Sequence, residues 1–306
     1  MRRALLLALL VLLPACGSNP SAAPPSPRPS PTTADVDTDP QPGTVTEKRL
    51  RRARVATAGA GTARTTFMAT ITGIPGRPAP VSLAGSGAVD FTTARLRSNI
   101  DLSGALELST GERPGAGRPD PSWETISADG LVYLRAPMLS DLLAIKTPWV
   151  RIDPSSEILH AAEGFAPISQ LAGSDSGASL ALIAGLERGS VRDLGSKDVE
   201  GTATTHLRAT VDLLVAAGAG VDLSDPEAQA LQRFVDGLGA QRLTVDAFLD
   251  GDDRVRRLVY EHELGPDAGG GTQRVELEYG DFGAPLDIAL PPKDQVTELD
   301  QVFGGL

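Results

Sequence analysis

The sequence has one cysteine, Cys16, in 306 residues, and only 4% of its residues are aromatic. A lone cysteine cannot form an intrachain disulfide, so this residue needs another explanation. With few aromatic side chains, apolar faces must be built mainly from Leu, Val, Ala and Ile. Lysine is scarce as well, with 4 Lys against 24 Arg, and together with abundant Ala, Gly and Pro this indicates a GC-rich genome, typical of an actinobacterium.

Positive charge is also in deficit. The chain carries 28 basic and 39 acidic residues, a formal net charge of −11. Phosphate binding requires clustered positive charge, so this balance argues against nucleic acid as a partner. It also argues against a basic patch for anionic lipid head groups.

Residue patterns for catalysis or metal binding are missing. The three histidines, His160, His206 and His262, lie far apart and none has a metal-ligand neighbour at helix or hairpin spacing. His206 and His262 fall on expected strands, as part of a sheet surface or a satisfied core. Residues 250–253 lack the calcium-loop pattern, and residues 173–177 place Asp175 where a nucleophilic serine would stand. We therefore expect no enzyme activity and no cofactor or metal.

The N-terminus has the layout of a secretory signal peptide. Arg2 and Arg3 precede an apolar run from Ala4 to Leu13, which is too short to span a bilayer. Leu13-Pro14-Ala15-Cys16 follows and resembles a bacterial lipobox. This resemblance implies that residues 1–15 are removed and that Cys16 is acylated, by chains such as palmitate. The alternative is a free or buried thiol beside an ordinary signal peptide. Acylation predicts an exported protein, lipid-anchored to the outer face of the cytoplasmic membrane.

Residues 16–46 then form the predicted tether, and residues 47–306 a single domain. Residues 17–46 hold eight prolines and almost no large apolar side chain, so they cannot bury enough surface to offset the entropy of ordering. Thr46–Ala58 is the first expected helix, with Leu50, Ala53 and Val55 as its apolar face. Its five basic residues either contact head groups or form a solvated face of a helix packed over a sheet; the second is favoured.

Beyond Thr62 the pattern has period two, which is typical of half-buried antiparallel strands. Strands are expected at Thr62–Thr72, Val81–Phe91, Arg95–Leu102, Leu106–Ser109, Trp123–Ser127, Leu131–Arg135, Trp149–Ile152, Val191–Gly195, Thr204–Leu213, Leu243–Leu249, Val255–Leu264 and Thr272–Phe282. Short helices are expected in the middle of the chain, at Pro137–Ile145, Ser155–Ala162 and Ser179–Leu186. The clearest helix is Pro226–Leu238, which Asp225 can cap and Gly239 ends.

Three stretches resemble segments of a known group of envelope proteins. They are Gly195–Gly201, Thr205–Asp212 and Tyr279–Pro292, and they are similar to the actinobacterial LppX/LprG-type envelope lipoproteins and, more distantly, to the Lol lipoprotein carriers. The resemblance implies an α+β fold in which a strongly curved antiparallel half-barrel has helices packed on its concave side. It also implies an apolar cavity that binds or carries an acylated lipid or lipoglycan.

The alternation along these strands predicts which residues point inward. The ligand-cavity candidates are Phe67, Ile71, Leu96, Ile100, Leu207, Val211, Val245, Leu258, Tyr260, Val275 and Leu277. One hypothesis is a membrane-anchored protein that binds or carries acylated lipids in this cavity. The alternative is a tethered, non-enzymatic scaffold with a filled core, which recruits an envelope protein through its acidic surface. Alternation cannot separate the two, because a cavity wall and a packed core have the same pattern.

Overall fold

A computed structural model describes residues 45–76, 78–103, 120–153, 176–218, 241–264 and 270–303. Cys16, the signal peptide and nearly all of the tether lie outside these residues. So do the helices expected at Ser155–Ala162 and Pro226–Leu238 and the strand expected at Leu106–Ser109.

The described residues form one sheet of 12 strands in the order β12-β6-β5-β4-β3-β2-β1-β11-β10-β9-β8-β7. All pairings are antiparallel except β12 with β6. The strands are β1 (Thr62–Thr72), β2 (Val81–Asp90), β3 (Arg95–Asp101), β4 (Ser122–Ala128), β5 (Leu131–Arg135), β6 (Trp149–Ile152), β7 (Arg192–Val199), β8 (Thr202–Asp212), β9 (Arg242–Leu249), β10 (Val255–Glu263), β11 (Thr272–Gly280) and β12 (Val296–Glu298).

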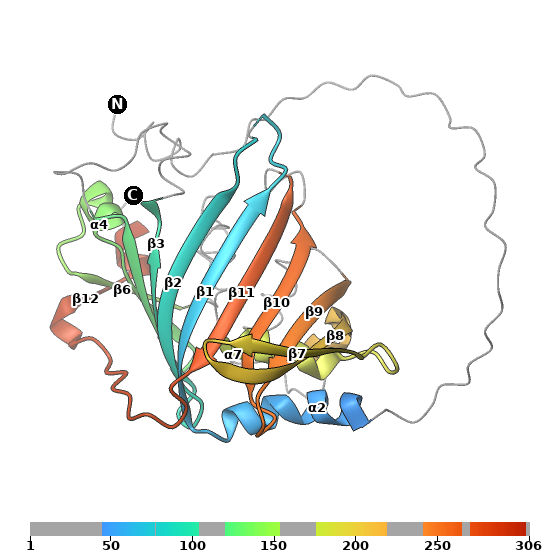
Figure 1. Ribbon diagram of the computed structural model, residues 1–306. Coiled ribbons are helices and arrows are strands. Elements are labelled where there is room, and N and C mark those ends of the chain that lie inside the picture. The colour runs from blue at the N-terminus through green and yellow to red at the C-terminus, as the bar shows by residue number, and fades with distance from the viewer. Residues whose placement is uncertain are drawn as a thin grey trace.

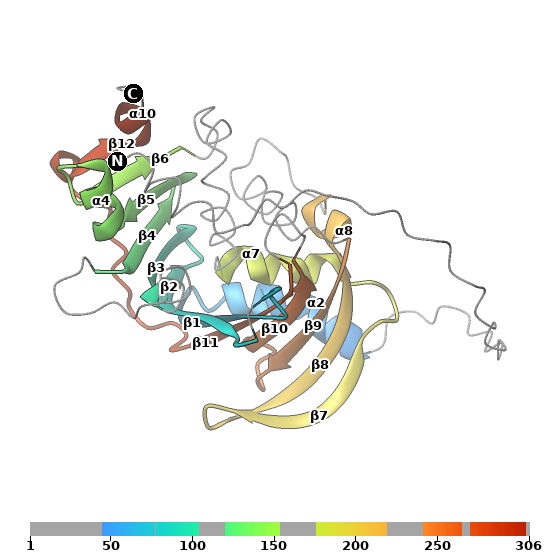
Figure 2. The same ribbon diagram turned by 90° about the horizontal axis from the view of Figure 1, so that it is seen from above.

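The sheet curves into a half-barrel whose two edge strands, β12 and β7, do not meet (Figure 1). Seen from above, it forms an arc with α7 (Ser176–Ala181) and α8 (Leu213–Gly218) on its concave side (Figure 2). The 3-10 helix η3 (Leu182–Gly185) connects α7 to the segment before β7. Its Gly185 lies against the backbone of Asp212: a Cβ added to this glycine would be 2.2 Å from the Asp212 carbonyl oxygen. The predicted fold class, a curved antiparallel half-barrel with helices on the concave side, is confirmed.

Strand positions agree closely with the period-two pattern. Side chains of β1 and β3 alternate between buried and exposed along most of each strand. The expected turn after β4 also forms: Asp129 and Gly130 both have positive φ, 53° and 75°, as a tight hairpin turn requires.

Four elements differ from the expectation. β12 and α10 (Leu299–Phe303) were not expected, because a three-residue strand is too short to show a pattern. Leu213 begins α8 instead of ending a strand. The first helix, α2 (Val45–Ala58), begins two residues before the predicted domain boundary at 47.

Helix α2 closes one end of the half-barrel, at the bottom of Figure 1. Its buried face comprises Glu47, Leu50, Ala53 and Thr57. Val55 was expected on this face and instead is 73% exposed. Thr57 is on the inner side of the helix because it lies four residues after Ala53, whereas Val55 points outward.

Polar contacts hold α2 against the turn between β9 and β10. The Thr57 hydroxyl donates to the Ala53 carbonyl oxygen (2.7 Å) and accepts the backbone N–H of Val255 (2.9 Å). Arg49 pairs with Asp253 and donates to the carbonyl oxygen of Asp250 (2.9 Å). The helix is therefore fixed by contacts whose partners lie some 200 residues away in the chain.

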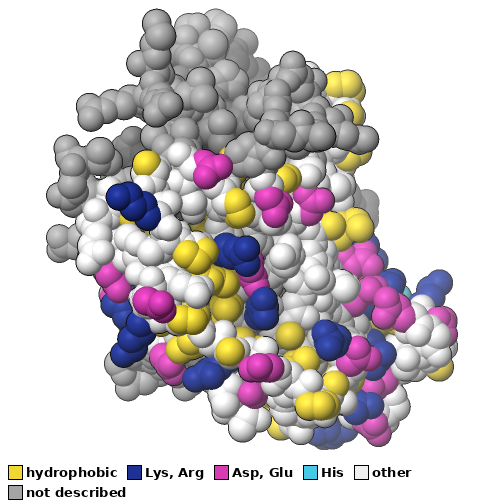
Figure 3. All heavy atoms as spheres, turned by 90° about the vertical axis from the view of Figure 1, so that its left-hand side faces the viewer, with side chains coloured by type: hydrophobic (Ala, Val, Ile, Leu, Met, Phe, Trp, Pro, Cys, Tyr) yellow, Lys and Arg dark blue, Asp and Glu magenta, His cyan; other side chains and the backbone are white. Residues whose placement is uncertain are grey.

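The convex face near β4–β6 is covered by the segment after β11. Ile288 on this segment packs with Ile126 and Trp149 in a small cluster separate from the main core. The short helices α4 (Pro137–Leu143), η5 (Lys293–Gln295) and α10 lie at this end. Figure 3 views the molecule from this side, where apolar side chains are interspersed with acidic and basic ones.

We predict that Thr57→Val lowers the free energy of unfolding by about 1–2 kcal/mol, because the buried Val255 N–H loses its acceptor while the side-chain shape is kept. Chemical denaturation measures the change. The control is Thr72→Val, at an exposed position of β1, which should stay within about 0.5 kcal/mol of the unmodified protein. Equal effects of the two substitutions would contradict this role of Thr57.

Candidate functional site

The concave face is built from rows of side chains that run across the strands. In the central row, Phe67 on β1 pairs with Leu277 on β11, which pairs with Leu258 on β10. Leu258 pairs with Ala247, and Ala247 with Leu207. All five are buried, and Leu207, Ala247 and Leu258 are completely inaccessible. Antiparallel pairing places directly opposed residues on the same face, so this row is a continuous apolar band.

A second row lies one step further from α2. Ala69 pairs with Val275, Val275 with Tyr260, and Tyr260 with Val245, which is followed by Ala209. The Tyr260 ring is fully buried, and burial raises the pKa of its phenol far above the ordinary value of 10.0, although the nearby Ser179 of α7 opposes the shift. The phenol therefore stays neutral, and α7 covers this part of the face.

The third row, at the end of the sheet remote from α2, is different. Here Ile71 pairs with Gln273, and Gln273 with His262. Ile71 and Gln273 are only half-buried, whereas His262 is 8% exposed. We call these three residues the upper row. It combines an apolar side chain with two neutral polar groups, and it adjoins the second row.

His262 is the most unusual residue of the upper row. Its Nδ1 is buried and has no hydrogen-bond partner within the described ranges. Burial lowers the pKa of His262 below its ordinary value, and the neighbouring Glu263 carboxylate offsets this only in part. The expectation of a sheet-surface or satisfied core histidine is therefore wrong: the imidazole is buried, neutral and unsatisfied at one ring nitrogen, which is costly unless something else binds there.

The sequence-derived inward residues are brought together. Ten of the eleven are buried in one hydrophobic cluster: Phe67, Leu96, Ile100, Leu207, Val211, Val245, Leu258, Tyr260, Val275 and Leu277. The eleventh, Ile71, is half-buried in the upper row. Their inward orientation is confirmed, and their role as ligand contacts stays a prediction.

Sequence reasoning missed the polar members of this face. Gln273 alternates in phase with Val275 and Leu277, and His262 in phase with Leu258 and Tyr260. This shared alternation could have identified both residues as inward-facing. A search for inward hydrophobic residues passes over polar ones.

The concave face also holds more aromatic side chains than the composition suggests. Tyr260 and Tyr279 are the largest fully buried side chains described, and Phe67 packs with them in the main cluster. The Phe67 ring lies directly over Gly85, where an added Cβ would be 2.1 Å from its Cε1 atom. The part of the face nearest α2 is thus densely packed, and the upper row is its least buried part.

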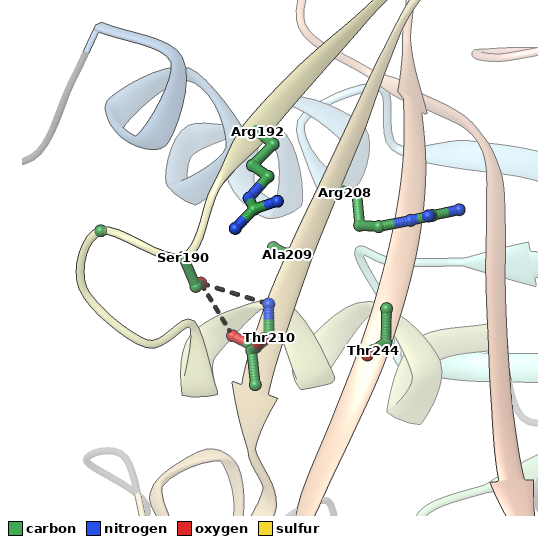
Figure 4. A pocket seen from close by; sticks show the side chains of 7 residues that line it. Ser190, Arg192, Arg208, Ala209, Thr210 and Thr244 are labelled. Atoms are coloured by element: carbon green, nitrogen blue, oxygen red, sulfur yellow. Dashed lines mark hydrogen bonds between the residues drawn. The ribbon is translucent and has the colours of Figure 1, made fainter. Parts of the chain in front are cut away.

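A shallow pocket of about 220 Å³ lies elsewhere, beside β7, β8 and β9 (Figure 4). The Ser190 hydroxyl donates a hydrogen bond to the Thr210 carbonyl oxygen and accepts one from the Thr210 backbone N–H. Arg208 extends away from Arg192 toward β9, where it pairs with Asp246 at 2.9 Å. Since Ser190 and Arg208 already have partners and the pocket is open, it presents little to a ligand.

The convex face carries a His–Asp pair that resembles the His–Asp part of a catalytic triad. His206 Nε2 lies 2.7 Å from Asp246, and its ring stacks on Phe248 with centroids 4.3 Å apart. Burial raises the pKa of Asp246, but hydrogen bonds from Arg208 and His206 outweigh it and hold this pKa below its ordinary value. No nucleophile hydrogen-bonds to His206 among the described residues, so the group is a surface ion-pair network.

In the described part of the chain, no group of three His, Cys, Asp or Glu side chains is placed to hold a metal ion. None of the helices in those ranges is both long enough and apolar enough to cross a bilayer.

We predict that His262 makes the fold less stable in mild acid. Its folded pKa lies below its ordinary value of 6.5, so below about pH 6.5 the unfolded chain takes up a proton that the folded chain does not, and the free energy of unfolding falls as the pH is lowered. His262→Gln should flatten this dependence between about pH 7 and pH 5. Urea unfolding at several pH values measures it, and an unchanged slope in the variant would rule the effect out.

Asp246 acts at lower pH, because the stabilisation from its carboxylate is lost only near and below its ordinary pKa of 3.8.

Several solved structures are similar to this chain, all at low sequence identity. LppX of Mycobacterium tuberculosis is 10% identical, with 80% of this chain and 98% of that chain covered and a TM-score of 0.45. LprF of Mycobacterium bovis is 14% identical, covering 80% and 96%, with a TM-score of 0.40. A LolA superfamily protein of Nitrosomonas europaea is 10% identical, covering 82% and 99%, with a TM-score of 0.27.

No protein-family model matches the chain, and no curated protein sequence matches it. LppX and a LolA superfamily protein, the two groups that the sequence was predicted to resemble, are thus among the solved structures similar to this chain. The function proposed below rests on the residues of this chain.

Proposed function

We propose that this protein is an exported lipoprotein, anchored through Cys16 to the outer face of the cytoplasmic membrane, that binds an acylated lipid on the concave face of its half-barrel. The observation that carries the proposal is the upper row, where two apolar rows end at half-buried Ile71 and Gln273 and at a buried, unsatisfied His262. A ligand with an apolar chain and a neutral polar group fits both halves of this surface.

The apolar side chains that stay half-buried at the end of this face, Ile71 and Leu83, supply the driving force for chain binding. An acyl chain that leaves water for such a face gains about 0.8 kcal/mol per methylene, so long chains bind without directed polar contacts. Ligand sites of this type are concave and mostly apolar, with a few placed polar groups that fix orientation. Leu83 and Val81 of β2 extend the apolar surface beside Ala69 and Ile71.

The polar members of the upper row favour an uncharged part of the ligand. His262 is neutral, so one ring nitrogen can donate a hydrogen bond and the other can accept one. Gln273 offers an amide with both donor and acceptor groups beside it. Ester carbonyl groups and hydroxyls match these partners, and a diacylated glycerol backbone carries both.

The packed region nearest α2 fits the alternative of a scaffold with a filled core. Leu258, Leu277 and Tyr279 leave no accessible surface there beyond 1%. Ligand binding is therefore assigned to the upper row and the adjoining second row, and the central row is assigned to the stability of the sheet.

We expect the full protein to retain acylated lipid through gentle purification, and to rebind it after delipidation. Ile71→Trp should reduce retained lipid several-fold, because the indole fills the half-buried position. Met68→Trp is the matched control, three residues earlier on β1 and 52% exposed. Native mass spectrometry gives the bound mass. If no lipid mass appears on the unmodified protein, or if both variants behave alike, lipid binding on this face is wrong.

Anchoring is a separate prediction. Cys16→Ala should release the mature protein from membranes or leave an unprocessed precursor, because the acyl chains provide the attachment. Membrane flotation with mass measurement of the N-terminal peptide tests this. Mature Cys16→Ala protein that floats as well as the unmodified protein would refute the anchor.

A further inference from the structure

One surface combines exposed positive charge with exposed apolar side chains. It is the outward side of α2, opposite the buried residues Leu50, Ala53 and Thr57. We call it the α2 basic face, and it comprises Val45, Lys48, Arg51, Arg52, Arg54 and Val55. Val45 and Val55 are 84% and 73% exposed, and the Arg52 side chain is 65% exposed.

The charge on α2 is opposite in sign to that of the chain as a whole. The helix has five basic residues and one acidic residue, a formal charge of +4, within a chain of −11. The negative net charge of the chain is an average over all residues. It does not exclude a local excess of positive charge, and α2 has one.

Part of this charge is free of nearby acids. Arg49 and Arg52 share Asp253, and Arg51 pairs with the buried Glu47 at 2.9 Å. Burial raises the pKa of Glu47, but the Gly189 N–H and Arg51 outweigh it and keep this carboxylate ionised. Lys48 and Arg54, by contrast, are in no ion pair with any residue that the structure describes, and both are exposed.

These positions share a side of the helix. Lys48 and Arg52 are four residues apart, as are Arg51 and Val55, so each pair forms neighbours on the surface. The resulting arrangement is a stripe of cations with a valine at each end. The long basic side chains can reach lipid phosphates while the valines approach the interface.

We infer that the α2 basic face docks the domain on the head groups of an anionic phospholipid bilayer. Val45 is the first described residue, directly after the segment that begins at Cys16, so this end of the domain is the one joined to the membrane anchor proposed above. A tether holds the face at high local concentration near the bilayer, and modest attraction then suffices. Docking in this way directs the upper row, at the opposite end of the sheet, away from the membrane (Figure 1).

The test uses the full acylated protein in vesicles of phosphatidylcholine alone or of equal parts phosphatidylcholine and phosphatidylglycerol. Cys16 is the sole natural cysteine and its thiol is acylated, so Val55→Cys provides one site for an environment-sensitive fluorophore. Met68→Cys, exposed on the convex side of β1, is the control site. We expect a blue shift at residue 55 only in the anionic vesicles, lost at about 1 M salt, where the screening length is about 3 Å.

Charge reversal provides the second arm. Lys48→Glu with Arg54→Glu breaks no ion pair among the described residues and should lower the ratio of docked to free domain at least tenfold, since each cation contributes roughly fivefold at an anionic surface. Arg64→Glu with Arg274→Glu makes the same change in net charge on the convex face and should leave docking intact. Circular dichroism confirms that both variants fold.

The outcomes separate docking from anchoring. Flotation reports anchoring, and the fluorophore reports docking of the anchored domain. If the protein does not float, co-sedimentation of the unanchored full chain with the same vesicles decides: binding that needs phosphatidylglycerol supports the α2 basic face, and no binding overturns it. Equal signals at residue 55 in both vesicle types, or equal effects of the two double variants, overturn it as well.

Discussion

The register of strand pairing is the constraint on which the rest of the structure depends. A sheet that curves without closing must cover its concave side, and a shift of one residue in any strand would turn that strand's apolar side chains outward. Pairing of Phe67 with Leu277 and of Leu258 with Ala247 prevents this. The row that results fixes where helices can pack and leaves the upper row at the far end.

The polar groups of the concave face have a different physical basis. An unsatisfied buried imidazole destabilises the fold, and Nδ1 of His262 on β10 has no partner in the described residues. Such a cost is typical of residues retained for binding rather than stability. Neutrality follows from burial, so the same environment that makes His262 costly also makes it suitable for an ester or hydroxyl group.

Charge is organised by face. On the convex side, acidic and basic residues alternate between neighbouring strands: Arg97 pairs with Glu124, and Arg257 with Glu276 at 3.1 Å. Such partly exposed pairs add little stability individually, but they keep the outer face of a large sheet soluble. On α2 the balance is broken, because Lys48 and Arg54 have no acid beside them in the described structure. A chain with a negative total charge thus has one helix with a local excess of positive charge.

The sequence by itself determined the α+β class, nearly all of the strands and the inward phase of ten buried residues, because alternation and turn signals such as Asp129-Gly130 are local. It also identified Cys16 and the tether, which remain predictions. Only the tertiary structure decided the 12-strand order, the short β12 and the exposure of Val55. It alone placed His262 and Gln273 beside Ile71, and left Lys48 and Arg54 of α2 without an ion pair in the described residues. These depend on contacts between residues as much as 200 positions apart, and local patterns carry no information about such contacts.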